Sequence, residues 1–209
     1  MKRNLTFFAV LAVSMAVGLG RTTLVRVSVE ESARVADTAV VATVLSVEVV
    51  PHPGSVFTVW THVRLAVEDD LFGNLGGLEE LEITHPGGLY QGIYMEIPGH
   101  PEFSVGQRYV LFLWDESRPW FTPVVGFNQG AFRVIRDAEG VERVFNSHGA
   151  FPVKGFGWET AAEASIANVA PGSPVEDVVI GWPGEPALDL DSFVTKLTGI
   201  IQRLKEEIQ

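Results

Sequence analysis

Apolar and polar residues alternate along two long stretches in the first half of the chain. Residues 39–49 are rich in β-branched residues, and in residues 56–68 every odd position from Phe57 to Val67 is apolar or Thr. Alternation with a period of two predicts strands with one buried face. The turn at 51–54 contains Pro and Gly and joins the two stretches, which predicts an antiparallel hairpin.

One short run near the middle of the chain is apolar on both alternating faces. Residues 109–114, with the sequence YVLFLW, are large and apolar at odd and even positions alike. Such a strand is covered on both sides, so we expect it at the centre of a sheet or barrel. We expect Phe103 to fill the core beside it and the Tyr109 hydroxyl to find a hydrogen-bond partner.

Shorter stretches predict further strands at 78–84, 93–97, 120–125, 131–135 and 141–145. Residues 147–188, in contrast, are rich in Gly and Pro, and their apolar periodicity is weak. We interpret this segment as irregular, with one weak helical patch at 159–168.

Two helices are predicted, one on each side of this region. Ser28 and Glu31 have the spacing of a capping box, which predicts a short helix over 29–36. Residues 190–208 predict an amphipathic helix with Asp191 as its N-cap. Its apolar stripe comprises Phe193, Leu197, Ile200, Ile201 and Leu204. We expect this stripe to pack on the barrel; contact with a partner or a membrane surface is the alternative.

Together these elements predict a mainly β fold. The expected architecture is an OB-type closed or partly open β-barrel with a short N-terminal helix and a C-terminal amphipathic helix. The chain of 209 residues suits one such domain with appendages. We expect a signal peptide at 1–20, the barrel domain at 21–146, the irregular segment at 147–188 and the helix at 189–209.

The first twenty residues have the pattern of a secretory signal peptide. Lys2 and Arg3 precede an apolar segment at 5–17, and Gly18 and Gly20 have the spacing that a signal peptidase accepts. We therefore predict export to the periplasm or the extracellular space, with cleavage near Gly20. An uncleaved N-terminal anchor is the alternative. The chain has no Cys, which excludes a lipid anchor on Cys and any disulfide.

The protein is acidic, and cleavage of the predicted signal peptide would make its net charge more negative. Removing residues 1–20 takes away the two positive charges of Lys2 and Arg3 and no acidic residue, so the net charge changes from −11 to −13. Nucleic acids and anionic membranes need a basic surface, so both are poor partners for this chain. We expect an exported protein or a glycan as partner, and no stable membrane insertion after cleavage.

Three stretches carry a resemblance to a known family: ESARVADTAVVATV at 31–44, LFG at 71–73 and VGQRYVLF at 105–112. They resemble the opening helix and first strand, the end of the second strand and the glycine-led central strand of netrin-like modules. This family includes the tissue inhibitors of metalloproteinases, and uncharacterised exported bacterial proteins share the layout. The resemblance covers 28–137 and implies an OB-type barrel. Those inhibitors chelate the protease zinc through an N-terminal Cys; this chain has no Cys, so no inhibitory residue carries over.

The first candidate binding site lies on the second predicted strand. Trp60, His62 and Arg64 have the same parity and therefore share one face. In OB folds the second and third strands form a binding face, and an aromatic ring beside a cation suits a ligand contact. The alternative is that the C-terminal helix covers Trp60 and the other two side chains are solvated.

The second candidate is a group of two His and a carboxylate. His85, Glu96 and His100 fall close together in the sequence and form a candidate zinc set, although their spacing matches no metal motif. The chain has neither a Gly-x-Ser-x-Gly motif nor a phosphate-binding loop. We therefore assign no catalytic residue and no cofactor.

These observations favour an exported, non-enzymatic binding module for a protein, a peptide or a glycan at the cell envelope. The first alternative is a metal-dependent hydrolase that uses His85 and His100. The second is an accessory or inhibitory module for an exported protease.

Overall fold

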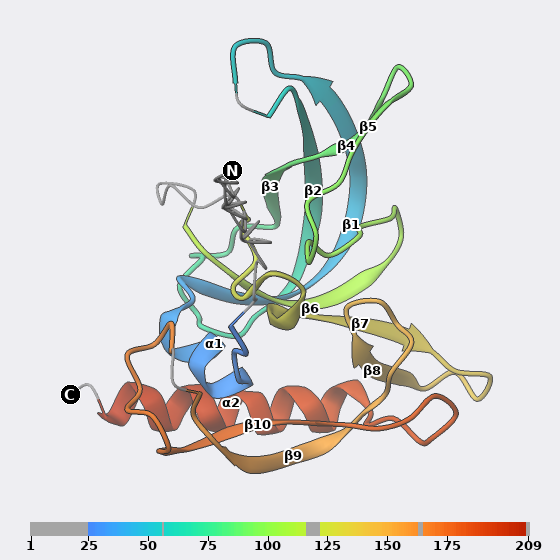
Figure 1. The fold of residues 1–209 in the computed structure, drawn as a ribbon. Helices are drawn as coiled ribbons and strands as arrows, with labels where there is room; N and C mark the ends of the chain where they lie inside the picture. The colour runs from blue at the N-terminus through green and yellow to red at the C-terminus, as the bar shows by residue number, and fades with distance from the viewer. Residues whose placement is uncertain (1–24, 56, 116–121, 163–164, 208–209) are drawn as a thin grey trace, which may run out of the picture.

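The structure is a computed structural model that describes residues 25–55, 57–115, 122–162 and 165–207. The predicted signal peptide and its cleavage position near Gly20 lie outside these residues. Over the described residues the fold is mainly β with two α-helices, which confirms the predicted class. In Figure 1, β1 and β2 rise through the upper half of the molecule, and α2 lies across its lower end beside β9 and β10.

The main sheet has six strands in the order β3-β2-β1-β6-β7-β8, and all its pairings are antiparallel. Their bounds are β1 (Thr38–Pro51), β2 (Val59–Asp70), β3 (Glu80–Pro86), β6 (Arg108–Leu113), β7 (Ala131–Arg136) and β8 (Glu142–Asn146). The predicted hairpin of the two long strands is confirmed as β1 and β2. Two bulges in their pairing, at Val41/Ala42 and Val44/Ser46, bend this hairpin.

This sheet is open among the described strands, so a closed barrel is not confirmed. Closure would need β3 to pair with β7 or β8. The free edge of β7 instead pairs with β8, because the tight turn at Asp137–Gly140 folds the chain straight back. The edge strands β3 and β8 therefore end the sheet.

Strand β6 lies centrally and is buried on both faces, as predicted. Tyr109, Leu111 and Leu113 contribute to one hydrophobic core, which β1, β2 and β3 share. Val110 and Phe112 contribute to the other, which lies between the sheet and the helices. The Tyr109 hydroxyl donates to the carbonyl of Glu102 at 2.8 Å, so the expected partner exists.

The two helices flank the second core. Helix α1 (Val29–Val35) has the predicted capping box of Ser28 and Glu31. Helix α2 (Leu190–Glu207) buries the whole predicted stripe, and its Phe193 ring lies 5.2 Å from the rings of Phe132 and Phe156. The expected packing of this helix on the sheet is therefore confirmed. Asp189, rather than the predicted Asp191, accepts the amide of Ser192 at 2.8 Å.

The segment 147–188 is not irregular throughout, contrary to the prediction. It contains the antiparallel pair β9 (Val153–Thr160) and β10 (Pro174–Ile180), and the weak helical patch at 159–168 does not form a helix in its described residues. Gly155 and Gly157 interrupt the apolar pattern of β9, and Glu176 and Asp177 are buried in β10. A periodicity of apolar residues does not detect strands of this composition.

The buried acids of β10 bind α1 and α2. Val29 donates its amide to Asp177 at 3.0 Å, and Glu176 donates its amide to the carboxylate of Glu30 at 3.0 Å. Arg203 of α2 lies 2.8 Å from Glu30 and 3.1 Å from Glu176. We call Glu30, Glu176, Asp177 and Arg203 the carboxylate cluster. It joins α1 to β10 and α2, which lie at the other end of the chain.

Two of the predicted short strands differ in the structure. The strand expected at 93–97 is β5 (Ile93–Met95), which pairs with β4 (Gly88–Tyr90) in a separate hairpin outside the main sheet. Of the strand expected at 120–125, residues 120 and 121 lie outside the described residues, and Val124 makes only an isolated bridge with Leu113. None of the described helices is both long enough and apolar enough to cross a membrane.

Candidate functional site

The three side chains of the predicted strand-face site lie on β2, and each of them already has a partner within the protein. Trp60 is half-buried beside the His52 ring, and its indole N–H donates to the carbonyl of Phe57 at 3.1 Å. Helix α2 packs in the other core, against Phe132 and Phe156, so the alternative in which this helix covers Trp60 is wrong.

The two polar members of this face bind acids on β3. His62 Nδ1 lies 2.7 Å from Glu82, and Arg64 lies 2.5 Å from Glu80. These cross-strand pairs are exposed, and such pairs are worth little in stability. Glu80 does offset the positive charge with which Arg64 would attract a ligand, and Glu82 occupies Nδ1 of His62.

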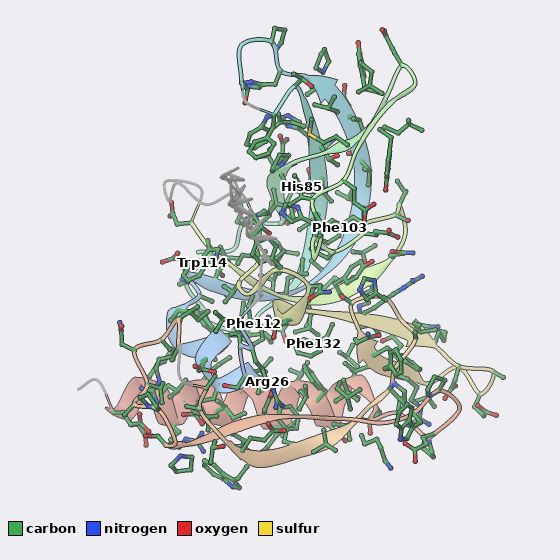
Figure 2. The ribbon with its side chains drawn as sticks, viewed as in Figure 1. Arg26, His85, Phe103, Phe112, Trp114 and Phe132 are labelled. Atoms are coloured by element: carbon green, nitrogen blue, oxygen red, sulfur yellow. The ribbon has the colours of Figure 1, made fainter. Side chains whose placement is uncertain are left out.

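A pocket opens on the other side of the same strands, where β5 and the loop 96–104 face β1, β2 and β3. It encloses about 320 Å³. Its apolar wall includes Val47, Val49 and Phe103, and its polar wall includes His85 and His100. We call it the histidine pocket. Figure 2 shows His85 and Phe103 together in the upper half of the molecule, well apart from Phe112 and Phe132 in the core below.

A sharp turn after β3 builds this pocket. Gly87 and Gly88 have φ of 106° and 126°, a region that side-chain-bearing residues rarely adopt. A Cβ on Gly88 would lie 2.7 Å from the Val49 side chain and from the Thr61 hydroxyl. The two glycines therefore let β4 and β5 fold closely back over the long hairpin.

The structure brings His85 and His100 together, as the candidate zinc set required. Their ring centres lie 5.0 Å apart in an edge-to-face arrangement. Phe103 contacts His85 on one side, at 6.3 Å between ring centres, and Phe127 contacts His100 on the other, at 5.4 Å. Sequence reasoning did not place Phe127 at this site, because nothing local relates it to residues 85–103.

Glu96, the third member of that set, does not join the two imidazoles. It lines the same pocket but accepts a hydrogen bond from the Tyr94 hydroxyl at 2.9 Å. In the part of the chain that the structure describes, no three His, Asp or Glu side chains form a group that could hold a metal ion. The remaining histidines lie elsewhere, with His52 beside Trp60 and His148 next to Asn128.

The two imidazoles differ in their hydrogen bonding. His85 Nδ1 lies 3.1 Å from the Pro86 carbonyl, so this nitrogen carries the proton and donates it. Both ring nitrogens of His100 are buried and have no hydrogen-bond partner among the described residues. Burial lowers the pKa of His85. Burial, assisted by the nearby His85, lowers the pKa of His100 to about 4. Both rings are therefore neutral at pH 7.

Comparison of the chain with protein-family models, with curated proteins and with solved structures found no match. The netrin-like resemblance therefore stays a prediction. What the histidine pocket can bind follows from its own geometry and chemistry.

We expect acid to destabilise the protein through His100. Between pH 6.5 and about 4 the unfolded chain binds a proton at this ring that the folded protein does not bind, so the free energy of unfolding falls as the pH is lowered through this range. His100→Phe keeps an aromatic ring and removes both unpartnered nitrogens. This variant should be more stable than the wild type, by about 1–3 kcal/mol, and should lose less stability in acid.

Urea unfolding at several pH values, in buffer with a chelator, measures this effect. The matched control is His148→Phe, because His148 is exposed on a loop. An acid sensitivity of His100→Phe equal to that of the wild type would assign the effect to other groups.

Proposed function

We propose that the protein is an exported, non-enzymatic binding module whose ligand site is the histidine pocket. The observation that carries this proposal is the imidazole of His100, whose two nitrogens are buried without a partner in the described residues. A buried polar group without a hydrogen bond costs about 1–3 kcal/mol. Such a group calls for an explanation, and a bound ion or water is one of the recognised ones.

The composition of the pocket supports the same conclusion. Binding sites for small ligands are concave, mostly apolar and marked by a few converging polar groups, often with shifted pKa values. The histidine pocket combines Val47, Val49 and Phe103 with two neutral imidazoles. Its volume of about 320 Å³ suits a single ring, a single side chain or a small ion with its water.

The strand face of Trp60, His62 and Arg64 is less well suited to this role. A ligand there would have to displace Glu82 and Glu80 from His62 and Arg64. In the histidine pocket, by contrast, the nitrogens of His100 have nothing among the described residues to give up. We therefore move the proposed binding site from the strand face to the pocket.

The two other functions stay less favoured proposals. The contact of His85 with His100 agrees with a metal-dependent hydrolase. Such an enzyme also needs a general base beside the metal, and Glu96, the carboxylate of the predicted set, is hydrogen-bonded to Tyr94 instead. An inhibitory module for a protease would bind it through an exposed edge or loop, and no feature of the described residues marks such a surface. A partly open OB-type barrel also stays a proposal; the position of β1 between β2 and β6 supports it.

Chemical-shift mapping tests the site. We would titrate ¹⁵N-labelled protein with a set of neutral one- and two-ring heteroaromatic fragments. The shifts should cluster at the amides of Gly87, Gly88 and His100. Val49→Trp, which fills the pocket, should abolish them, and Trp60→Ala should not. Shifts that cluster on β2 at His62 and Arg64 instead, and that survive Val49→Trp, would overturn the assignment to the pocket.

A further inference from the structure

The hydrogen bonding of His85 fixes one unprotonated nitrogen. Its Nδ1–H donates to the Pro86 carbonyl at 3.1 Å, so in the neutral ring Nε2 holds a lone pair. Histidines that bind metals typically donate their other ring N–H to a carbonyl or a carboxylate, which sets the tautomer and the ring orientation. His85 has this arrangement.

His100 offers the second nitrogen. A neutral imidazole always has one nitrogen with a lone pair, and no described residue donates to either nitrogen of His100. Phe127 and His85 hold its ring from two sides, with ring centres 5.4 Å and 5.0 Å away. This nitrogen is therefore held in place and not hydrogen-bonded by the protein.

The separation of the rings agrees with a shared ion. An imidazole nitrogen lies about 2.0–2.1 Å from a bound Zn²⁺, and two such rings around a tetrahedral ion have centres about 5 Å apart. The ring centres of His85 and His100 lie 5.0 Å apart.

The donor set selects a class of ion. Imidazole nitrogens suit Zn²⁺, Cu²⁺ and Ni²⁺, whereas Mg²⁺ and Ca²⁺ prefer oxygen. Glu96 and Glu102 line the same pocket, and the protein carries a net charge of −11, so the electrostatic field attracts cations. Two protein ligands leave coordination positions for water from the open pocket. The ion would therefore be exchangeable.

We propose that the ligand of the histidine pocket is a divalent transition-metal ion bound by His85 and His100. This proposal rests on the proposed function, since it names the ligand of the same site. It differs from a structural zinc site, which has four protein ligands, because the protein contributes only two. Such a site captures and releases its ion.

Calorimetric titration tests the proposal. Protein without a polyhistidine tag is stripped with a chelator and titrated separately with Zn²⁺, Ni²⁺, Cu²⁺ and Mg²⁺. At least one of the first three should bind with one ion per chain, and Mg²⁺ should not. His85→Phe and His100→Phe keep the aromatic packing and remove the nitrogens, so each should weaken binding about 100-fold. His62→Phe and His148→Phe, both outside the pocket, should bind as the wild type does.

Two results would overturn the proposal. One is the absence of transition-metal binding, and the other is binding that persists unchanged in both pocket variants. Circular dichroism of each variant confirms that it is folded. If fragments still map to Gly87, Gly88 and His100 while no metal binds, only the identity of the ligand is wrong. If neither fragments nor metals bind in the pocket, the proposed function fails as well.

Discussion

Leu111→Asp should abolish folding. Leu111 is fully buried in β6, and its side chain lies in the core that β1, β2 and β3 share. A carboxylate buried there without a partner costs more than the roughly 5–15 kcal/mol by which domains are stable. We expect the variant to be insoluble or to show no cooperative thermal transition by circular dichroism.

Leu45→Asp is the matched control. Leu45 sits in the bulge of β1 between Val44 and Ser46, and 40% of its surface is exposed. The same substitution there should change the free energy of unfolding by about 1 kcal/mol or less. A soluble, cooperatively melting Leu111→Asp variant would show that β6 is not the centre of the fold.

Phe193→Ala should produce the second large effect. Phe193 is fully buried, and its ring contacts Phe132 of the main sheet and Phe156 of β9 at 5.2 Å each. Truncating a buried Phe costs about 3–5 kcal/mol, through lost burial and through the cavity left behind. In a protein of this size that loss lowers the melting temperature by about 10 °C.

Urea unfolding checks this value, with Thr195→Ala as the control. Thr195 is exposed on the same helix, so its replacement should change the stability by about 0.5 kcal/mol or less. If Phe193→Ala cost no more than the control, α2 would not be an integral layer of the domain.

The central strand could be predicted because its evidence is local. Residues 109–114 are apolar at every position, and burial on both faces follows directly from that pattern. The capping box of Ser28 and Glu31 and the apolar stripe of α2 are local in the same sense. Each of these patterns can be recognised without knowing which other segment of the chain packs against it.

Strands β9 and β10 could not be predicted for the opposite reason. Glu176 and Asp177 look like surface residues, yet both are buried, because Arg203 and the amide of Val29 bind them. Those partners lie 27 and 148 positions away in the sequence. Only the tertiary structure makes these acids compatible with the interior.

The candidate site was predicted in part. Proximity in the sequence correctly grouped His85 with His100, but it also included Glu96, which turns to Tyr94 instead. The contribution of Phe127 depends on the packing of a distant segment. The strand face is not an open patch, because β3 places Glu82 and Glu80 diagonally across from His62 and Arg64, within ion-pair distance. A cross-strand neighbour is visible only when the register is known.

The carboxylate cluster has a consequence for the order in which the molecule assembles. Glu30, near the start of the described chain, binds the amide of Glu176, 146 positions later, and the guanidinium of Arg203, 173 positions later. Contacts of such long sequence separation slow folding, since the chain must close large loops before it gains them. During synthesis, Glu30 of α1 therefore cannot form these contacts until almost the entire polypeptide has been made. The hydrophobic core between the sheet and the two helices therefore stays incomplete in the nascent chain until α2 has been made.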